Sequence, residues 1–196
     1  MKICSSLTPI SRALARAGVT ADAVTLAGLV LGLVAAAMIA LDAPLWALGP
    51  LLASRLADGL DGAVARHTRL TDFGGYLDIV GDFIFYAAVL LGFLLADPAA
   101  NAGPAAVLMV SFFGTGSSFL AFATIAAKRG LSTEARGAKS FYYMGGLAEG
   151  TETILFFVLA CLIPQHFAWL AYGFALLCAV TIVGRALQAR ALFRTD

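Results

Sequence analysis

The sequence predicts an all-α integral membrane protein with six transmembrane helices and both termini in the cytosol. Hydrophobic residues make up 61% of the 196 residues and charged residues only 13%, and the mean hydropathy is +0.90. Too few polar groups remain to cover a surface that faces water, which excludes a soluble globular domain. The net charge of +1 gives no bulk basicity, so we expect no nucleic acid among the partners.

Six segments are long and apolar enough to cross a bilayer, which takes about 20 residues. They are residues 22–41, 45–66, 74–96, 104–127, 141–163 and 166–187. Proline, glycine and asparagine mark three of the turns between them, at residues 41–44, 97–104 and 164–166. We expect residues 1–196 to form one membrane domain built from these helices.

The positive charges all fall on one side of the predicted helices. None of the three turns just named holds a Lys or Arg. The 13 basic residues are Lys2, Arg12, Arg16, Arg55, Arg66, Arg69, Lys128, Arg129, Arg136, Lys139, Arg185, Arg190 and Arg194. By the positive-inside rule this side faces the cytosol, and an even number of helices then places both termini there.

Residues 1–20 are expected to be a cytosolic or interfacial segment. No apolar run of signal-peptide length occurs here, so we expect the first membrane helix to be retained. Residues 9–17 are compatible with a short amphipathic helix on the membrane and equally with a solvated tail. In the first membrane helix, the spacing of Gly28 and Gly32 permits close approach of another helix, and packing within the chain is favoured over a dimer contact.

Four carboxylates lie in two neighbouring predicted membrane helices. Asp58 and Asp61 come near the end of the second helix, and Asp78 and Asp82 near the start of the third. An Asp near the membrane centre costs about 2.5–3.5 kcal/mol, so four of them require a compensating cation or a water-filled cavity. The spacings i,i+3 and i,i+4 place each pair on one face of its helix.

The connector between the two helices is short enough to force an antiparallel pair. Thr71 or Asp72 is the expected N-cap of the third helix. Counted outward from this turn, Asp61 and Asp78 lie level with each other, and Asp58 and Asp82 lie level about one turn deeper. We therefore expect the four carboxylates to face one another at one depth.

A group of carboxylate oxygens suits Mg²⁺ or Mn²⁺, and two such ions are the usual device for displacement at phosphorus. Glycine and alanine beside the acids would let a diphosphate approach the backbone. In the competing interpretation, the acids are solvated at the membrane surface or pair with Arg55, Arg66 and Arg69. The register of four acids favours the metal site.

These residues resemble the signature of the CDP-alcohol phosphotransferase family. Eight positions match in order: Asp58, Asp61, Gly62, Ala65, Arg66, Gly74, Asp78 and Asp82. One departure is that seven residues separate Arg66 from Gly74, one fewer than in the family pattern. The difference falls in the turn and leaves both acidic pairs in register.

The resemblance implies a six-helix core with a cytosolic site. It also implies transfer of a phosphoalcohol group from a CDP-linked donor to an alcohol, with release of CMP. Asp58, Asp61 and Asp78 would bind the metal ions, Asp82 would be the general base or a further metal ligand, and Gly59, Gly62, Ala65 and Arg66 would line the CDP site. We further expect CDP-diacylglycerol as donor, a role in phospholipid synthesis, a homodimer, and location in the cell inner membrane, with the acceptor unidentified.

Two other classes remain open: a membrane prenyltransferase, which also holds a metal-diphosphate on pairs of Asp, and a non-enzymatic cation transporter. The first typically needs more helices than 196 residues supply. Membrane prenyltransferases also lack the Asp-Gly-x-x-Ala-Arg element found in this sequence. In a transporter, the acids should continue toward the outer side, whereas these four cluster near cytosolic helix ends. Only Glu149 and Glu152 are candidates to continue such a path.

The sequence has three further features. Glu149 and Glu152 lie within the predicted fifth helix and are candidates for contact with the acceptor or for an interfacial role. The basic loop at residues 128–139 would attract anionic headgroups or bind a phosphate. Cys4, Cys161 and Cys178 have no metal-ligand or disulfide spacing and are expected to be packing residues.

Overall fold

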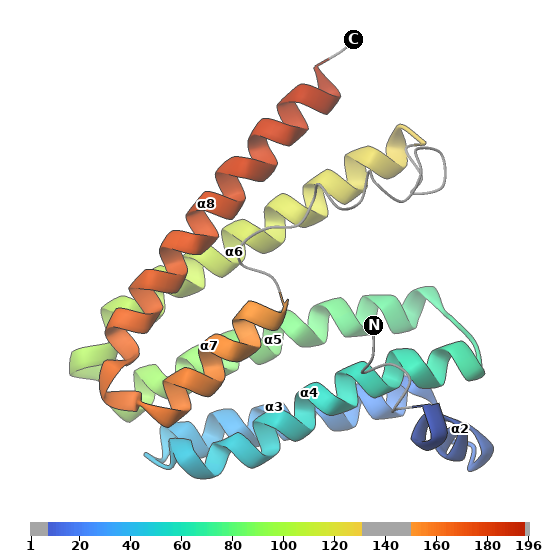
Figure 1. Ribbon diagram of the computed structural model, residues 1–196, viewed down its shortest axis with the longest axis horizontal. Helices are drawn as coiled ribbons and strands as arrows, with labels where there is room; N and C mark the ends of the chain where they lie inside the picture. The colour runs from blue at the N-terminus through green and yellow to red at the C-terminus, as the bar shows by residue number, and fades with distance from the viewer. Residues whose placement is uncertain (1–7, 131–149, 195–196) are drawn as a thin grey trace. The chain divides into compact units, whose positions relative to one another are not determined.

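The computed structural model describes residues 8–130 and 150–194, and all regular structure in those ranges is helical (Figure 1). The predicted all-α class is thereby confirmed. The helices are α2 (Thr8–Arg16), α3 (Ala21–Ala40), α4 (Pro44–His67), α5 (Asp72–Ala96), α6 (Pro98–Lys128), α7 (Gly150–Leu162), the 3-10 helix η3 (Pro164–His166) and α8 (Phe167–Phe193).

Four of the described helical segments are long and apolar enough to cross a membrane. They are α3, α5, α6 and the segment Pro164–Phe193, which joins η3 to α8. The 24-residue α4 has sufficient length but carries the charges of Arg55, Asp58, Asp61 and Arg66. The described part of α7 is a shorter apolar helix of 13 residues. The protein is thus built from several apolar helices, while the number of six spans and the cytosolic termini stay predictions.

Two predicted helix boundaries were wrong. Helix α6 begins at Pro98 and not at residue 104, and α8 continues to Phe193 and not to residue 187. Proline in a first turn costs little, because its missing N–H would have no helical partner there, and three alanines follow Pro98 before the next proline. At the other end, the polar residues after 187 leave the apolar pattern but are good helix formers.

The chain forms two compact units, residues 1–98 and 99–196. In the first unit, α3 lies against both α4 and α5, and α2 lies against α4 (Figure 1). In the second unit, Phe112 and Phe156 pack against Phe157 and Phe174, with ring centroids 5.0–6.2 Å apart. The first unit contains all four predicted site carboxylates.

Glycines of α3 allow α4 and α5 to approach α3 closely. A Cβ on Gly28 would lie 3.0 Å from the Cβ of Ala57 in α4. A Cβ on Gly32 would lie 2.4 Å from Cδ2 of Phe85 in α5. Both glycines are buried within the unit, which confirms the interpretation as packing within the chain.

Substitution of Gly32 tests this packing. Gly32→Ala should destabilise the protein by about 1–3 kcal/mol, because the Phe85 ring would have to leave its place in a buried contact. Gly49→Ala is the matched control, since nothing lies within 4 Å of a Cβ built there. Thermal unfolding of the detergent-purified variants measures both. A Gly32→Ala protein as stable as the Gly49→Ala protein would show that α5 adjusts without cost.

Helix α2 is formed in the predicted N-terminal segment and has one face on the protein. Ser11 is fully buried, while Ile10, Arg12 and Arg16 are exposed. This arrangement confirms a short helix with distinct faces. Its position relative to a membrane surface stays a prediction.

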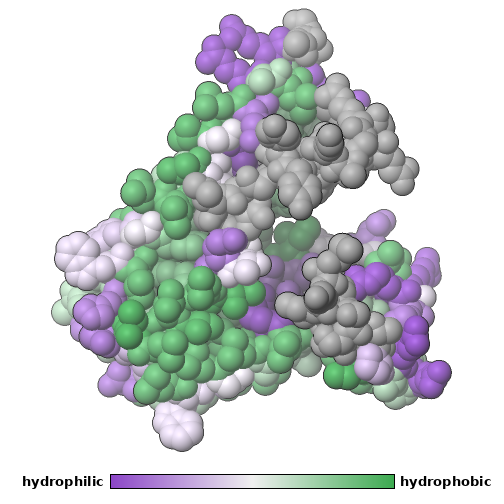
Figure 2. Space-filling view, viewed as in Figure 1, coloured by the Kyte–Doolittle hydropathy of each residue, from purple (hydrophilic) through white to green (hydrophobic). Residues whose placement is uncertain are grey.

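The molecular surface is largely apolar. Figure 2 shows hydrophobic residues over much of the visible face, with strongly hydrophilic residues in separate patches. Trp46 and Trp169 are 78% and 79% exposed near the starts of α4 and α8. Both follow turns that contain no Lys or Arg, and tryptophan is enriched where a membrane helix meets the headgroups.

The predicted topology can be tested by thiol labelling. Cys4 and the substitution Glu134→Cys should react with a membrane-impermeant reagent only from the cytosolic face, and Ala100→Cys only from the opposite face, because all basic residues lie on one side. Cys161 and Cys178 are buried, so their background should be low. Labelling of Glu134→Cys from outside would contradict the six-helix arrangement.

Candidate active site and metal centre

A capped turn sets the register between α4 and α5. The N–H of Thr68 donates to the carbonyl oxygen of Val64 at 3.0 Å as α4 ends. The N–H of Gly74 donates to Oγ1 of Thr71 at 3.0 Å as α5 begins. The prediction that an N-cap stands at Thr71 or Asp72 is confirmed, with Thr71 in that role. This turn brings the acidic end of α4 beside the acidic start of α5.

Three of the four predicted carboxylates converge. Asp58, Asp61 and Asp78 each have an oxygen within 4.8 Å of the other two. Asp61 is 6% exposed and Asp58 is half-buried, while Asp78 is exposed. Asp58 and Asp61 share one face of α4, and Asp78 lies on α5. The predicted antiparallel register of the two helices therefore accounts for the convergence of the three side chains.

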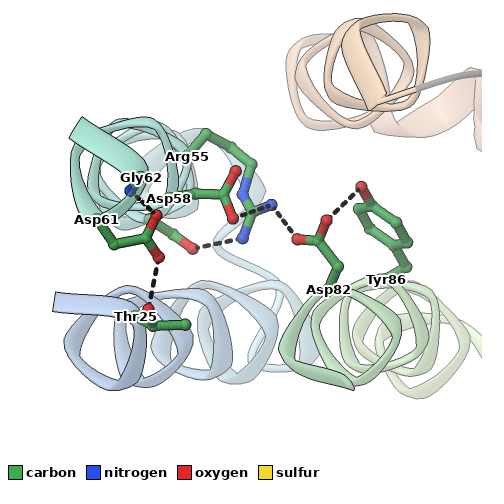
Figure 3. A network of polar contacts seen from close by, with 8 residues as sticks. Thr25, Arg55, Asp58, Asp61, Gly62, Asp82 and Tyr86 are labelled. Carbon is green, nitrogen blue, oxygen red and sulfur yellow. Dashed lines mark hydrogen bonds and ion pairs between the residues drawn. The ribbon is translucent and has the colours of Figure 1, made fainter. Parts of the chain in front are cut away.

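Asp61 is held in place by α3 as well as by its own helix. Oγ1 of Thr25 donates to Oδ2 of Asp61 at 2.6 Å, and the N–H of Gly62 donates to Oδ1 (Figure 3). Threonine in a membrane helix usually bonds to its own backbone, and Thr25 also lies 3.1 Å from the carbonyl oxygen of Ala21. The sequence therefore gave no signal for this contact between residues 36 positions apart.

The fourth carboxylate, Asp82, pairs with a buried arginine. Nη1 of Arg55 lies 2.6 Å from Oδ1 of Asp82 and 3.7 Å from Oδ1 of Asp58. Figure 3 shows Arg55 reaching from α4 between the two acids. The hydroxyl of Tyr86, one turn along α5, lies 3.4 Å from Oδ2 of Asp82. Of the pairings with arginine that the competing interpretation foresaw, those of Arg55 are present.

Arg55 is fixed by contacts besides its ion pairs. Its side chain is 9% exposed. The guanidinium carbon lies 4.1 Å from the centroid of the Phe85 ring, and Nη2 donates to Oγ of Ser54 at 3.2 Å. The ring that supports Arg55 is the one that packs on Gly32. The spacing i,i+3 between Arg55 and Asp58 was a signal for part of this network, although not for Asp82.

Two adjoining cavities in the first unit meet at the acids. The smaller, about 10 Å³, has room for about one ion or water molecule. It is lined by Thr25, Gly28, Leu29, Ser54, Arg55, Asp58, Asp61, Asp78, Gly81 and Asp82. The larger, about 150 Å³, is lined by Ala21, Asp22, Thr25, Asp61, Gly62, Ala65, Arg69, Leu70, Thr71, Gly74, Gly75 and Asp78. Thr25, Asp61 and Asp78 line both.

Of the residues predicted for a CDP site, two line the larger cavity and two do not. Gly62 and Ala65 line the larger cavity. Gly59 and Arg66 are exposed on α4 and line neither of the two cavities. Arg69, predicted only as a partner for the acids in the competing interpretation, supplies the larger cavity with a basic side chain.

The donor set of the cluster fits a hard divalent cation. Mg²⁺ binds carboxylate oxygen at about 2.0–2.1 Å, so two ligands on opposite sides of the ion are separated by roughly 4.2 Å. The separation of at most 4.8 Å among Asp58, Asp61 and Asp78 is close to this value. Asp82 lies in the same cavity, but it is not a member of this group.

The remaining polar predictions fall in the second unit or outside the described residues. Glu152 is exposed in the first turn of α7, whereas Glu149 and Cys4 fall outside the described ranges. Of the basic loop, only residues 128–130 are described. Cys161 and Cys178 are buried, as expected of packing residues.

Comparison with known proteins places this arrangement in a known group. A family model, CDP-alcohol phosphatidyltransferase, matches residues 18–184. The inner membrane protein YnjF of Escherichia coli is 53% identical over 174 residues, which cover 89% of this chain and 84% of that protein.

Two crystal structures of phosphatidylinositol phosphate synthase from Mycobacterium tuberculosis are similar in fold. The structure with CDP-DAG bound has a TM-score of 0.75 and 24% identity, covering 94% of this chain and 93% of that one. The structure with manganese and citrate has a TM-score of 0.68 and 25% identity, covering 92% and 87%. The family match spans both acidic pairs and most of the chain. The protein therefore belongs to the CDP-alcohol phosphatidyltransferase family.

Proposed function

We propose that the protein is a metal-dependent membrane transferase. It moves the phosphatidyl group of CDP-diacylglycerol to an alcohol acceptor and releases CMP. The observation that carries this proposal is the convergence of Asp58, Asp61 and Asp78 within 4.8 Å at the junction of two cavities. Family membership and the CDP-DAG held by the similar synthase support it.

The larger cavity suits the diphosphate and nucleoside of the donor. Gly62, Ala65 and Gly74 line it and present little side-chain bulk, so phosphate oxygens can approach the helix backbone. Arg69 offers a positive charge on the same wall. Arg66, exposed beside Gly62, is the further residue proposed for the donor, together with Gly59.

Asp58, Asp61 and Asp78 would hold Mg²⁺ or Mn²⁺, as two ions. When bound, such ions neutralise diphosphate oxygens and favour displacement at phosphorus. Thr25 orients Asp61 through the hydrogen bond at 2.6 Å, and support of this kind keeps a ligand oxygen aimed at the centre of the site.

Asp82 is proposed as the general base, with a role as a further metal ligand as the alternative. In the transfer, the acceptor oxygen forms a bond to the phosphorus that carries the diacylglycerol group. The bond from this phosphorus to the bridging oxygen breaks, and CMP leaves with that oxygen. The proton of the acceptor hydroxyl passes to the carboxylate of Asp82.

The setting of this reaction is proposed to be phospholipid synthesis at the cell inner membrane. The apolar helices and the printed name of the Escherichia coli relative support that location. The cytosolic orientation of the site follows from the distribution of basic residues. A homodimer, and contact of Glu149 or Glu152 with the acceptor, are proposals that rest on the sequence.

The direct test uses purified protein, CDP-diacylglycerol, Mn²⁺ and a panel of polar alcohols. We expect CMP release that requires both the metal and one of the alcohols, and mass spectrometry of the lipid product identifies the acceptor. A prenyltransferase or a cation transporter would release no CMP. Absence of CMP with every alcohol tried, from protein that still binds Mn²⁺, would contradict the proposed reaction.

A further inference from the structure

Among the described residues that line the smaller cavity, Arg55 is the one cation. It lies outside the eight positions that carry the family resemblance. Its guanidinium contacts Asp82 at 2.6 Å and Asp58 at 3.7 Å. Its presence beside proposed metal ligands requires an explanation, because a fixed positive charge opposes cation binding.

Asp82 differs from the other three acids in the partner it has. Asp58, Asp61 and Asp78 each have an oxygen within 4.8 Å of the other two, whereas Oδ1 of Asp82 lies 2.6 Å from Nη1 of Arg55. At 2.6 Å this is a short, charge-assisted hydrogen bond. For Asp82 to reach a metal ion through this oxygen, its ion pair with the buried guanidinium of Arg55 would have to break, and a buried charge left without its partner is costly.

The place of Arg55 is set by packing that needs no metal. The Phe85 ring supports the guanidinium at 4.1 Å from the ring centroid, and Ser54 accepts a hydrogen bond at 3.2 Å. Gly32 leaves the space that the Phe85 ring occupies. Arg55 is thus held by α3, α4 and α5 together, and it can hold Asp82 in turn.

The second oxygen of Asp82 is bound less tightly. Oδ2 has the hydroxyl of Tyr86 at 3.4 Å, which is at the long limit for a hydrogen bond between oxygens. An acceptor hydroxyl would therefore meet Oδ2 with less competition than at Oδ1. The two oxygens of one carboxylate have separate tasks in this arrangement.

We propose that Arg55 is a positioning residue that holds Asp82 apart from the metal ligands. A divalent cation is then bound by Asp58, Asp61 and Asp78, and Asp82 stays free to take the proton of the acceptor. This inference rests on the proposed function and decides between the two roles proposed for Asp82.

Binding of Mn²⁺ to the detergent-purified protein without donor tests the inference. Four proteins are compared by electron paramagnetic resonance of free Mn²⁺: wild type, Asp82→Asn, Arg55→Gln, and the double variant. Asp82→Asn should bind Mn²⁺ within about twofold of wild type, because Asp82 is not a ligand. Arg55→Gln should bind on the order of tenfold more tightly, the scale of effects from groups that orient ligands, because the released Asp82 joins the cluster.

The two single variants separate ligation from simple charge, because a pure charge effect would make Asp82→Asn weaken Mn²⁺ binding about as much as Arg55→Gln strengthens it. The double variant tests whether the gain passes through Asp82. Because it lacks this carboxylate, an affinity gained through Asp82 should disappear in it. Asp58→Asn is the positive control for a lost ligand and should weaken Mn²⁺ binding at least on the order of 100-fold. If Asp82→Asn weakens binding as much as Asp58→Asn does, or if the gain of Arg55→Gln persists in the double variant, the inference is wrong.

Two further comparisons cover a variant that fails to fold and a failure of the proposed transfer reaction. Should Arg55→Gln fail to fold, as judged by size exclusion and thermal unfolding, the comparison of Asp82→Asn with Asp58→Asn still decides, since both retain Arg55. CMP release is measured separately. Because Mn²⁺ binding requires no donor, failure of the proposed transfer reaction would appear in the CMP assay and not in the four affinities.

Discussion

Asn in place of Asp58, Asp61 or Asp78 is expected to reduce metal-dependent CMP release by about 10²–10³-fold, the scale for removal of one electrostatic stabiliser from an active site. Asn keeps the size of the side chain and removes the charge. Each of the three acids has an oxygen within 4.8 Å of the other two, so each loss affects the same centre. Steady-state CMP release with CDP-diacylglycerol and Mn²⁺ measures the effect.

Asp42→Asn is the matched control for these three variants. Asp42 is exposed in the turn between α3 and α4, with a φ of 59°, a conformation that Asn adopts readily. It should retain wild-type CMP release. Size exclusion should show all four variants folded. Near-normal turnover in the three cluster variants would mean that the carboxylates serve another purpose.

Asp82→Asn should fail in a different way. Loss of a general base typically costs 10²–10⁴-fold in rate, so transfer should fall by about that factor, while Mn²⁺-dependent binding of CDP-diacylglycerol should stay within about threefold of wild type. Equilibrium binding of the donor and single-turnover CMP release measure the two steps separately.

Asp72→Asn provides the comparison on the same helix. Asp72 is exposed in the first turn of α5 and lines neither cavity of the site, so both donor binding and transfer should be retained. Loss of donor binding in Asp82→Asn, equal to its loss of transfer, would assign Asp82 to the donor site and exclude it as the base.

Local rules were sufficient for the part of the site that lies on α4 and α5. The spacing of Asp58 and Asp61 places them on one face, and the short turn capped by Thr71 fixes the register against Asp78. These contacts join residues on neighbouring antiparallel helices. Sequence periodicity and the length of one connector therefore determine them.

Contacts that depend on side-chain packing among three helices could not be predicted in the same way. Thr25 reaches Asp61 from α3, and Arg55 bends toward Asp82 because Phe85 supports it. Gly32 has to be small for Phe85 to be there. These contacts have no periodic signature, since each depends on how side chains of different helices pack against one another.

Dependence on packing also explains why the start of α6 was not predicted. Proline, asparagine and glycine at residues 97–104 are typical of a turn, and the sequence predicted one. The helix nevertheless begins at Pro98 and continues through Pro104. A proline in the first turn breaks no bond, and packing decides whether a second proline is tolerated further along. Asn101 and Pro104 are both buried, which indicates that packing has that role here.

The length of α6 has a consequence for the lipid around the protein. Its 31 residues extend about 46 Å at 1.5 Å per residue. Even at a tilt of about 40° it reaches about 35 Å along the bilayer normal, which exceeds the roughly 30 Å of hydrocarbon. At least one turn of a membrane-spanning α6 must therefore extend beyond the hydrocarbon. The end of the helix at Lys128 is the one with a basic residue.

Arg129, just beyond this end, donates to the carbonyl oxygen of Phe193 at 3.0 Å and so ties the last turn of α8 to the same level. In the predicted topology both helix ends lie at the level of the lipid phosphates, where basic side chains are well solvated. A thicker bilayer would draw Lys128 and Arg129 toward hydrocarbon and remove water from them. Because the hydrogen bond joins the ends of α6 and α8, a change in membrane thickness should shift or tilt the two helices together.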